Sequence, residues 1–446
     1  MKKHRIASIF IALFLLVCLV PSIGLLLTGG SGAAANQVLA SRPALLDKEG
    51  KLNLRFAPAL ADYINDRFAL RQQAVTLWAG LNAKLLHSSV ADDVLLGRDG
   101  WLYYVPALPD YTRTRGMSER ELWCAARTLA LLQEAVETSG GQFLFTVAPN
   151  KSSLYDAHLP ALTRQDGSSD AERLAAQLEA QGVRYLDLFS AFRAQSEELY
   201  YPRDSHWNCR GAALAADAIL ASLGRERGYF TAAFEPGSHR GDLYEMLFPL
   251  GTDEDPDFVY VPGFTFTASS ENPDALRLNT QQAKGEGALL MYRDSFGRAL
   301  YPYLAESYAE AQFSRSNDYS PDALPEGGTL IVELVERNLR YILENPPSMR
   351  SPERSLVLSA AAETGLCVTL TQSADAADTL LLCGDYGGLC PDADSPVYLQ
   401  AGGRVFEAVP GAEGFCARLS AADCGGALRL CFYCGGQLVA IEALVA

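Results

Sequence analysis

The stretch "GALLMYRDSFG", residues 287–297, decides the fold class of this chain. Its first half is a short apolar run, which is typical of a strand buried on both faces of a parallel sheet. Its second half, "RDSFG", places Ser295 in a tight turn directly after that strand. Because open parallel sheets bind ligands at the carboxyl ends of their strands, we expect Ser295 at the edge where a site forms.

Short apolar strands alternate with helices on both sides of this stretch. The pattern predicts strands at 142–149, 183–189, 309–315 and 328–335, and helices at 119–138, 169–181 and 209–223. This alternation predicts an α/β domain with a doubly wound parallel sheet, covered by helices on both faces. We assign residues 111–345 to this domain. Residues 229–286, rich in Gly, Pro, Asp and aromatic side chains, break the rhythm and are interpreted as an insertion.

The chain begins with a basic segment and an apolar run. Residues 1–5 carry three positive charges, and residues 6–27 carry none of either sign. About 20 apolar residues suffice to span a bilayer, so we expect residues 1–30 to form a transmembrane anchor. The alternative is a signal peptide cleaved near Ala33–Ala35. Either reading places the bulk of the chain outside the cytoplasm, in the first case as a single-pass membrane protein.

Two further regions flank the α/β domain. Residues 31–110 predict an extension with helices in 56–86 and a hairpin at 95–104, around an Asp-Gly turn. After a proline-rich linker at 344–355, short alternating runs and Gly-rich turns predict a small β-sandwich-like domain at 356–446.

Seven of the ten cysteines lie in that last domain. Outside the cytoplasm such crowding predicts disulfides, although an odd number prevents complete pairing within the domain. Cys431 and Cys434 have the spacing of a redox or metal pair, but no histidine or second pair accompanies them. We therefore expect no metal and no cofactor.

The overall charge limits the possible partners. The formal net charge is −16 at pH 7, whereas nucleic acids and anionic membrane surfaces attract proteins with a basic footprint. We expect no nucleic-acid partner.

A second chemical motif lies in "YYPRDSHWN", residues 200–208. In Asp-x-His, the carboxylate of Asp204 is near enough in sequence to reach Nδ1 of His206, which leaves Nε2 for a serine. Serine is a poor nucleophile until a base takes its proton and an acid orients that base. Ser295, Asp204 and His206 therefore predict a catalytic relay. The alternatives are a helix N-cap at Asp294 or Ser295 and an ordinary loop histidine at His206.

These and other short motifs resemble one known family. The motifs are "RDSHWN", "YRDSFG", "VAPNKSSLY", "GRDGWLYY" and "INDRFALR", with "GDLYEM" and "ELVERNL" as further signatures. In their order and spacing along the chain they resemble the SGNH-hydrolase-like proteins of the alginate O-acetylation type, AlgJ and AlgX, and still more their DHHW-type bacterial relatives. The likeness covers roughly residues 40–345. In that family Asp-x-His precedes the serine, as it does here, in a circular permutation of ordinary SGNH esterases.

The resemblance implies the roles of three residues and the class of reaction. Ser295 would be the nucleophile, His206 the general base and Asp204 its orienter. The reaction implied is acetyl transfer to an extracytoplasmic polysaccharide, with acetyl groups supplied by a membrane-bound O-acyltransferase. The cysteine-rich last domain matches no motif of the carbohydrate-binding domain of AlgX, so the glycan is left open.

Five more residues are predicted near the substrate. Asn150 and Lys151 follow the strand 142–149, and a lysine there would bind a carboxylated sugar or an oxyanion, or else lie in a surface loop. Arg293 and Arg298 flank the serine turn and would act likewise. Trp207 would stack on a sugar ring or pack the loop as a wedge. His87, His158 and His239 are left as surface or structural residues.

Three functions remain open at this point. The chain is an O-acetyltransferase of a surface or secreted glycan, a carbohydrate esterase that uses the same relay with water as acceptor, or a non-catalytic component of a glycan-binding or export complex. The first two require the same residues.

Overall fold

A seven-stranded sheet forms the centre of the computed structural model, which describes residues 2–28, 39–358, 361–376 and 378–445. The first five strands in the sheet are parallel, and the last two, from the insertion, are added to them through antiparallel pairing of β8 with β10 and of β7 with β8. The predicted parallel α/β domain is thus confirmed, with an antiparallel edge added to it. The strand order is β4 (Tyr185–Leu186), β3 (Gln142–Ala148), β11 (Thr329–Val335), β9 (Ala288–Tyr292), β10 (Glu310–Ser314), β8 (Arg277–Gln281) and β7 (Thr267–Ala268).

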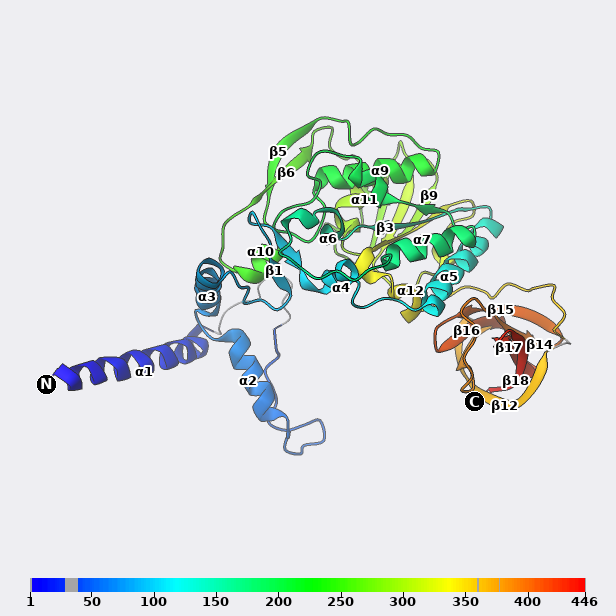
Figure 1. Ribbon diagram of the computed structural model, residues 1–446, viewed down its shortest axis with the longest axis horizontal. Helices are drawn as coiled ribbons and strands as arrows, with labels where there is room; N and C mark the ends of the chain where they lie inside the picture. Colours follow the sequence, from blue (N-terminus) through cyan, green and yellow to red (C-terminus); the bar gives the residue numbers. More distant parts are fainter. Residues whose placement is uncertain (1, 29–38, 359–360, 377, 446) are drawn as a thin grey trace.

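Helices cover both faces of this sheet (Figure 1). One face carries α8 (Leu188–Arg193), α9 (Cys209–Ser222) and α11 (Gly297–Ala305), and the other carries α5 (Glu119–Thr138) and α7 (Asp170–Ala180). Strand β3 shows why both faces are apolar. Leu144 belongs to the first core and Phe143 and Phe145 to the second, because successive side chains of a strand point to opposite faces.

The helices α5 and α7 begin where the sequence supplies a capping box. The hydroxyl of Ser118 accepts from the amide of Glu121, and the Glu121 carboxylate accepts from the amide of Ser118. Ser169 and Glu172 form the same pair at α7. Each box satisfies two amides that have no partner inside the helix. Shorter helices in this domain are α4 (Leu108–Thr112), α6 (Lys151–Leu154) and α12 (Tyr341–Glu344).

The first part of the insertion, before β7 and β8, forms a small unit beside the sheet. Strands β5 (Phe234–His239) and β6 (Asp255–Tyr260) pair as an antiparallel ribbon, with α10 (Asp242–Leu247) between them. The end of β5 and the start of α10 lie next to the loop that contains Asp204. The insertion therefore contributes to the region where the sequence predicts a site.

The N-terminal region consists of helices and one hairpin. Helix α1 (Lys2–Thr28) extends away from the body of the molecule in Figure 1, followed by α2 (Phe56–Arg67) and α3 (Arg71–Leu86). Strands β1 (Val94–Leu96) and β2 (Leu102–Tyr104) pair around Asp99 and Gly100, which both have positive φ and so suit an Asp-Gly turn.

The predicted transmembrane anchor gains no support from the structure. Within the described part of the chain, no helix meets the length and apolarity needed to cross a membrane. The alternative cleavage site at Ala33–Ala35 lies outside the described residues.

The predicted C-terminal β-rich domain is present, but its strands form a closed barrel, so the prediction of a sandwich-like arrangement is wrong. Its order is β12 (Ala362–Ala376), β13 (Thr379–Asp385), β16 (Gly414–Ser420), β15 (Arg404–Pro410), β14 (Val397–Ala401), β17 (Leu428–Cys434) and β18 (Gln437–Val445). The long strand β12 closes it, because one part of β12 pairs with β13 and another with β18. Closure depends on pairing between the first and last strands, which a pattern of alternating residues does not reveal.

Among the described cysteines, one disulfide is present, between Cys383 and Cys416 on the neighbouring strands β13 and β16. Cys431 and Cys434 are both free and lie on β17. Residues three apart on a strand point to opposite faces, which argues against a shared metal ion at this pair.

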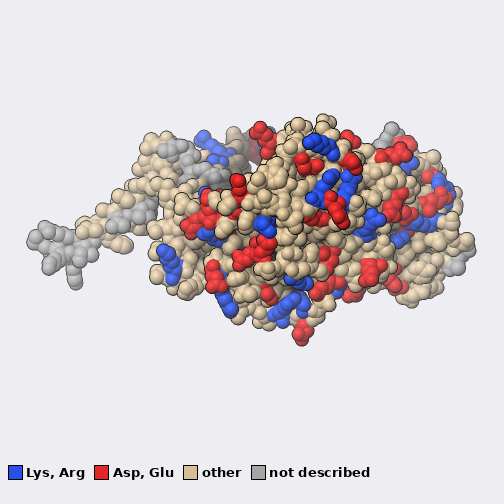
Figure 2. All heavy atoms as spheres, turned by 90° about the horizontal axis from the view of Figure 1, so that it is seen from above, with Lys and Arg blue, Asp and Glu red and all other residues tan. Residues whose placement is uncertain are grey.

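An ion-pair network centred on the buried carboxylate of Glu407 joins the barrel to the α/β domain. Glu407 of β15 is 1% exposed and accepts two hydrogen bonds from Arg127 of α5, at 2.6 and 2.7 Å. Arg354 of the linker donates to Glu407 at 2.7 Å and makes two bonds of 2.6 Å to Glu134 of α5. Figure 2 shows acidic and basic side chains interspersed on the face it presents, rather than separated by sign.

We expect Glu407→Gln to loosen this junction. This substitution removes the carboxylate charge that Arg127 and Arg354 share, and so weakens the contact between the barrel and the α/β domain. Hydrogen–deuterium exchange should therefore become faster in β15 and in the linker 345–358. Lys51→Ala, which removes an exposed ion pair to Glu49 outside this junction, is the control and should leave that exchange unchanged. Equal exchange in both variants would contradict a structural role for Glu407.

Candidate active site

Ser295 lies in the turn between strand β9 and helix α11, where it is partly buried. Its neighbour Asp294 fixes the turn. One carboxylate oxygen accepts from the amide of Phe296 at 2.9 Å, and the other accepts from the amide of Val335 at 2.7 Å and the side chain of Asn338 at 2.9 Å. The turn is therefore tied to the carboxyl end of β11, the adjacent strand.

The structure brings Ser295, His206 and Asp204 together. Nε2 of His206 lies 2.8 Å from Oγ of Ser295, and Nδ1 lies 2.7 Å from Oδ1 of Asp204. Oδ1 also accepts from the backbone amide of His206 at 2.8 Å. With Nδ1–H donated to Asp204, Nε2 is the acceptor for the serine proton, which is the arrangement of a nucleophilic serine relay.

Two residues of the insertion complete the surroundings of Asp204, and the sequence analysis missed both roles. Nε2 of His239 lies 2.8 Å from Oδ2 of Asp204, and the amide of Asp242 donates to the same oxygen at 2.8 Å. The assignment of His239 as a residue outside the site is thus wrong. Asp242 lies in "GDLYEM", which the sequence marked only as a family signature.

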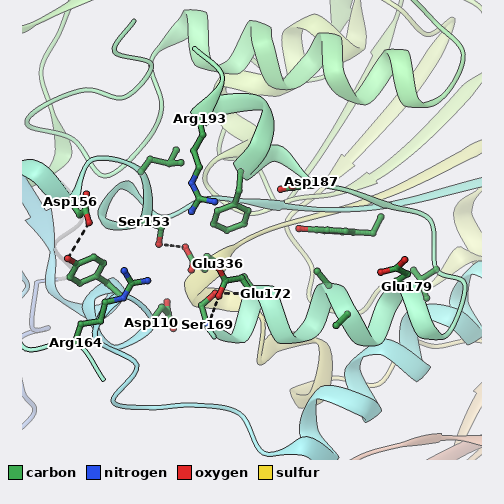
Figure 3. A pocket seen from close by; sticks show the side chains of 18 residues that line it. Asp110, Ser153, Asp156, Arg164, Ser169, Glu172, Glu179, Asp187, Arg193 and Glu336 are labelled. Carbon is green, nitrogen blue, oxygen red and sulfur yellow. Dashed lines mark hydrogen bonds between the residues drawn. The ribbon is translucent and has the colours of Figure 1, made fainter. Parts of the chain in front are cut away.

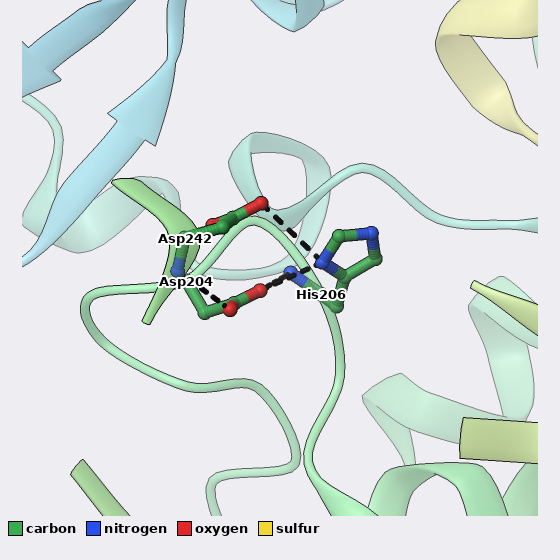
Figure 4. Close-up of side chains that lie close together, drawn as sticks. All are labelled: Asp204, His206 and Asp242. Atoms are coloured by element: carbon green, nitrogen blue, oxygen red, sulfur yellow. Dashed lines mark hydrogen bonds and ion pairs between the residues drawn. The ribbon is translucent and has the colours of Figure 1, made fainter. Parts of the chain in front are cut away.

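Asp242 also reaches His206 from the other side. Its Oδ2 lies 3.6 Å from Nδ1 of His206 and accepts from the hydroxyl of Ser205 at 2.7 Å. Figure 4 shows the carboxylates of Asp204 and Asp242 directed toward the same ring nitrogen of His206. Two carboxylates at Nδ1 stabilise the imidazolium that forms when the ring accepts a proton.

The charges of the cluster shift its pKa values in a consistent way. Burial raises the pKa of Asp204, but its pairs with His206 and His239 outweigh burial and hold that pKa well below its usual range. Burial lowers the pKa of His206, but Asp204 outweighs it and raises that pKa above the usual value. The pKa of His239 is raised for the same reasons. Burial and the charge of Asp204 raise the pKa of Asp242.

A metal ion is the alternative interpretation of this cluster. Among the described residues, Asp204, His206 and Asp242 have ligand atoms within 4.8 Å of one another. However, both oxygens of Asp204 already accept hydrogen bonds, and Nδ1 of His206 shares its proton with Asp204. A cation would have to replace these donors, so the hydrogen-bonded relay is the better fit to the residues present.

Lys151 is hydrogen-bonded to the backbone of the loop that contains Asp204. Its Nζ donates to the carbonyls of Tyr201, Pro202 and Asp204, at 3.2, 3.0 and 2.5 Å. The side chain is buried, and burial lowers the pKa of Lys151 to about 8. The predicted role in binding substrate is therefore wrong, because all three donors of the ammonium face the loop backbone.

Three more of the residues predicted to contact substrate are buried in the structure. Trp207 is fully buried and donates to the carbonyl of Phe296 at 3.1 Å, so it packs the loop, as the second alternative stated for it predicted, and does not stack on a sugar. Asn150 is buried and donates to Asp110 at 2.9 Å. Arg293 is buried against the ring of Tyr301 and donates to the carbonyl of Pro273.

Arg298 is the exception among the predicted substrate residues. Its side chain is 62% exposed on α11, three residues after Ser295, and lies 3.5 Å from Asp274. It remains available to a ligand.

Arg337 is a site residue that the sequence analysis did not identify, although it lies in "ELVERNL". Its guanidinium lies 5.4 Å from the centre of the Phe296 ring and donates to Asn150 at 3.3 Å. Its charge opposes that of Asp204 and lowers the pKa of His206 by a smaller amount. The sequence does not reveal that Arg337 lies near Phe296, because their contact depends on the register of β11 against β9.

The fold is an SGNH-like α/β domain in which Ser295, His206 and Asp204 are linked by hydrogen bonds. Residues 94–285 match the family model of the SGNH hydrolase-like domain of the acetyltransferase AlgX. This match includes Asp204, His206, His239 and Asp242 and ends before Ser295. The resemblance stated from the sequence is confirmed.

Particular relatives show the extent of that likeness. The probable alginate O-acetylase AlgJ of Pseudomonas syringae pv. tomato is 27% identical over 212 residues, which is 44% of this chain and 51% of that protein. This chain thus spans about half the length of the curated relative it matches. The solved O-acetyltransferase domain of Pseudomonas putida AlgJ is 18% identical, over 55% of this chain and 92% of that one, with a TM-score of 0.38. A DHHW family protein from Eubacterium siraeum is 17% identical over 50% and 90% of the two chains, with a TM-score of 0.39.

We expect Asp204→Asn to lower the pKa of His206. Burial alone favours the neutral ring, and the negative charge of Asp204 is the main opposing influence. The measurement is an NMR titration of the histidine side chains, with His206→Gln to assign the signal. Asp253→Asn removes an exposed carboxylate that pairs with Arg203 and serves as the control. An unchanged pKa in Asp204→Asn would show that Asp204 does not control the ring.

Proposed function

We propose that this chain is an extracytoplasmic O-acetyltransferase that modifies a cell-surface or secreted polysaccharide through an acetyl-serine intermediate. The observation that carries the proposal is the chain of contacts from Ser295 to His206 and from His206 to Asp204, at 2.8 and 2.7 Å. The match of residues 94–285 to an acetyltransferase domain supports the same reaction class, as does the likeness to a probable alginate O-acetylase.

The first half of the proposed reaction loads the enzyme. Nε2 of His206 takes the proton of Ser295 as Oγ attacks the carbonyl carbon of the acetyl donor. The imidazolium then gives this proton to the leaving group, and the acetyl group stays on Oγ as an ester. Asp204 stays ionised throughout and stabilises the imidazolium, which agrees with its strongly lowered pKa.

The second half transfers the acetyl group to the glycan. A sugar hydroxyl gives its proton to Nε2 of His206 and attacks the acetyl carbon. The tetrahedral intermediate collapses, Oγ of Ser295 leaves and recovers the proton from His206, and an O-acetyl sugar is released. If water takes the place of the sugar, the same steps give an esterase, which is the alternative function.

The acetyl donor and the location are also part of the proposal. A membrane-bound O-acyltransferase supplies the acetyl groups, as the family resemblance implies. A location outside the cytoplasm is supported by the disulfide between Cys383 and Cys416, since disulfides persist in oxidising compartments. We also propose that the N-terminal helix attaches the protein to the membrane.

We expect Ser295→Ala and His206→Ala each to reduce hydrolysis of p-nitrophenyl acetate to near background. The double variant should lose little more, because members of a relay act as one unit. In the unaltered protein the rate should fall as pH drops through the pKa of His206, since only the neutral ring accepts the serine proton. Because that pKa is raised, the fall should begin at a higher pH than for an ordinary histidine. Full activity in Ser295→Ala would refute the relay.

Adding an acceptor separates the two catalytic functions. An oligosaccharide should divert acetyl groups from water to sugar if the chain is a transferase, and mass spectrometry of the sugar detects the product. An esterase would instead release acetate at an equal or lower rate with no acetylated sugar. Ser205→Ala is the control. It removes a hydroxyl near Nδ1 of His206 but leaves the proposed nucleophile in place, so transfer to the sugar should persist in this variant.

We expect cell fractionation to place the protein in the membrane fraction, with its C-terminus accessible to protease only from outside. The physical reason is the uncharged apolar run of residues 6–27 behind a basic start. A soluble form beginning near Asn36 would show cleavage of a signal peptide. Protection of the C-terminus in intact cells would contradict the proposed location.

A further inference from the structure

A cavity of about 940 Å³ lies on the α7 side of the sheet. It is bounded by α7, α8 and the segments that follow the carboxyl ends of β3, β4 and β11, represented by Ser153, Asp187 and Glu336. Of the described residues that line it, none belongs to the Ser295–His206–Asp204 relay. Its volume is near the upper end of the range of roughly 300–1,000 Å³ that small-molecule sites occupy.

Small residues of α7 create the space. Leu174 and Leu178 face the core of the domain, while Ala175 and Ala176 line the cavity. Residues 175 and 176 therefore occupy a face where longer side chains would fill the volume. Ala180, further along the same helix, is exposed like Ala176 but is not part of the lining.

Aromatic rings supply flat apolar walls. Tyr111, Tyr185 and Phe189 line the cavity, and each is only partly buried. Arg164 lies over Tyr111 at 5.1 Å, and Arg193 lies over Phe189 at 5.6 Å. These contacts hold two of the rings in place. Partly exposed rings of this kind are suited to cover the apolar face of a sugar ring.

Carboxylates dominate the polar part of the lining. Six acidic residues face two arginines, and the labelled acids in Figure 3 surround the space from several elements. This excess disfavours a polyanionic ligand and favours one rich in hydroxyl or amino groups, which donate hydrogen bonds to carboxylates. The six acids are Asp110, Asp156, Glu172, Glu179, Asp187 and Glu336.

Glu336 anchors the inner wall of the cavity. It is 4% exposed, and its Oε2 accepts from the amide of Asn150 at 3.0 Å and the hydroxyl of Ser153 at 2.6 Å. Burial raises the pKa of Glu336, and burial together with the charge of Glu336 raises the pKa of Asp110 to about 7. Both carboxyls are thus held in a polar wall that is fixed before any ligand arrives.

We propose that this cavity binds a saccharide chain without acidic groups, at a site separate from the relay. The proposal combines the partly buried rings, the hydrogen-bonding carboxylates and the room left by the alanines of α7. The acidic side chains of the lining would repel a polyuronate, so this ligand is disfavoured. Resting on the proposed function, we further assign the bound saccharide as part of the acceptor glycan.

The cavity adjoins the relay through two consecutive residues. Glu336 lines the cavity, while Arg337 lies over the ring of Phe296, next to Ser295. Asn150 contacts both, through its amide to Glu336 and its side-chain oxygen to Arg337. A chain held in the cavity is therefore close to the wall of the site where acetyl transfer would occur.

Isothermal titration of the full chain with matched tetrasaccharides tests the binding site. The probes are tetramers of glucose, N-acetylglucosamine, glucosamine and mannuronate. We expect at least one of the first three to bind and mannuronate to bind most weakly. Ala176→Trp fills the cavity and should weaken binding about tenfold, equivalent to about 1.4 kcal/mol, whereas the matched variant Ala180→Trp should bind as the unaltered protein does.

Three results would overturn the proposal. They are no binding of the first three tetramers, tightest binding of mannuronate, or equal affinity in Ala176→Trp and Ala180→Trp. The titration measures binding without turnover, so its result does not depend on whether Ser295, His206 and Asp204 are catalytic. Loss of acetyl transfer with intact binding would leave the cavity site valid, and a raised KM for the sugar in Ala176→Trp, with no change in Ala180→Trp, would connect it to the acceptor.

Discussion

The buried carboxylate of Asp204 is the interaction on which the candidate site depends. Its two oxygens accept four hydrogen bonds, two from His206 and one each from His239 and Asp242. A buried charge is costly unless such donors satisfy it, and here the donors come from two parts of the chain, the loop of residues 200–208 and the insertion. The same charge therefore orients the imidazole and fixes the insertion against the domain. The insertion is a component of the site, since without it one oxygen of Asp204 would lose both of its donors.

The remaining supports of the site come from the sheet. Lys151, directly after β3, holds three backbone carbonyls of the loop that contains Asp204. Asp294, directly after β9, holds the serine turn against the end of β11. Because both residues follow strands of the same parallel sheet, they hold the His206 loop and the Ser295 turn at a fixed distance from each other. Preorganisation of this kind matters because a relay works only when base and nucleophile meet within hydrogen-bond reach.

Most of the fold could be predicted from the sequence, because strands such as 288–292 and helices such as 119–138 have clear apolar periods. The pair Asp204 and His206 was also predictable, since the two residues are close in the chain. His239, Asp242 and Arg337 were not, because their contacts with the cluster depend on how the insertion folds back and on strand register. Lys151 was correctly placed near the site but assigned the wrong contacts, whereas for Trp207 the structure shows the second of the two alternatives, a wedge that packs the loop. A sequence shows that a lysine follows a strand, yet only the packed loop shows that three carbonyls enclose its ammonium.

The end of β11 explains how one domain can hold two chemically different sites. Strand β11 ends at Val335, and the next three residues, Glu336–Asn338, form a short 3-10 helix. Glu336 faces a cavity rich in carboxylates, whereas Arg337 lies toward the ring of Phe296 and opposes the negative charge around His206. The wall between the two regions is therefore negative on one side and positive on the other. A glycan without acidic groups is compatible with both sides, since its hydroxyls donate to the carboxylates of the cavity and accept from a guanidinium.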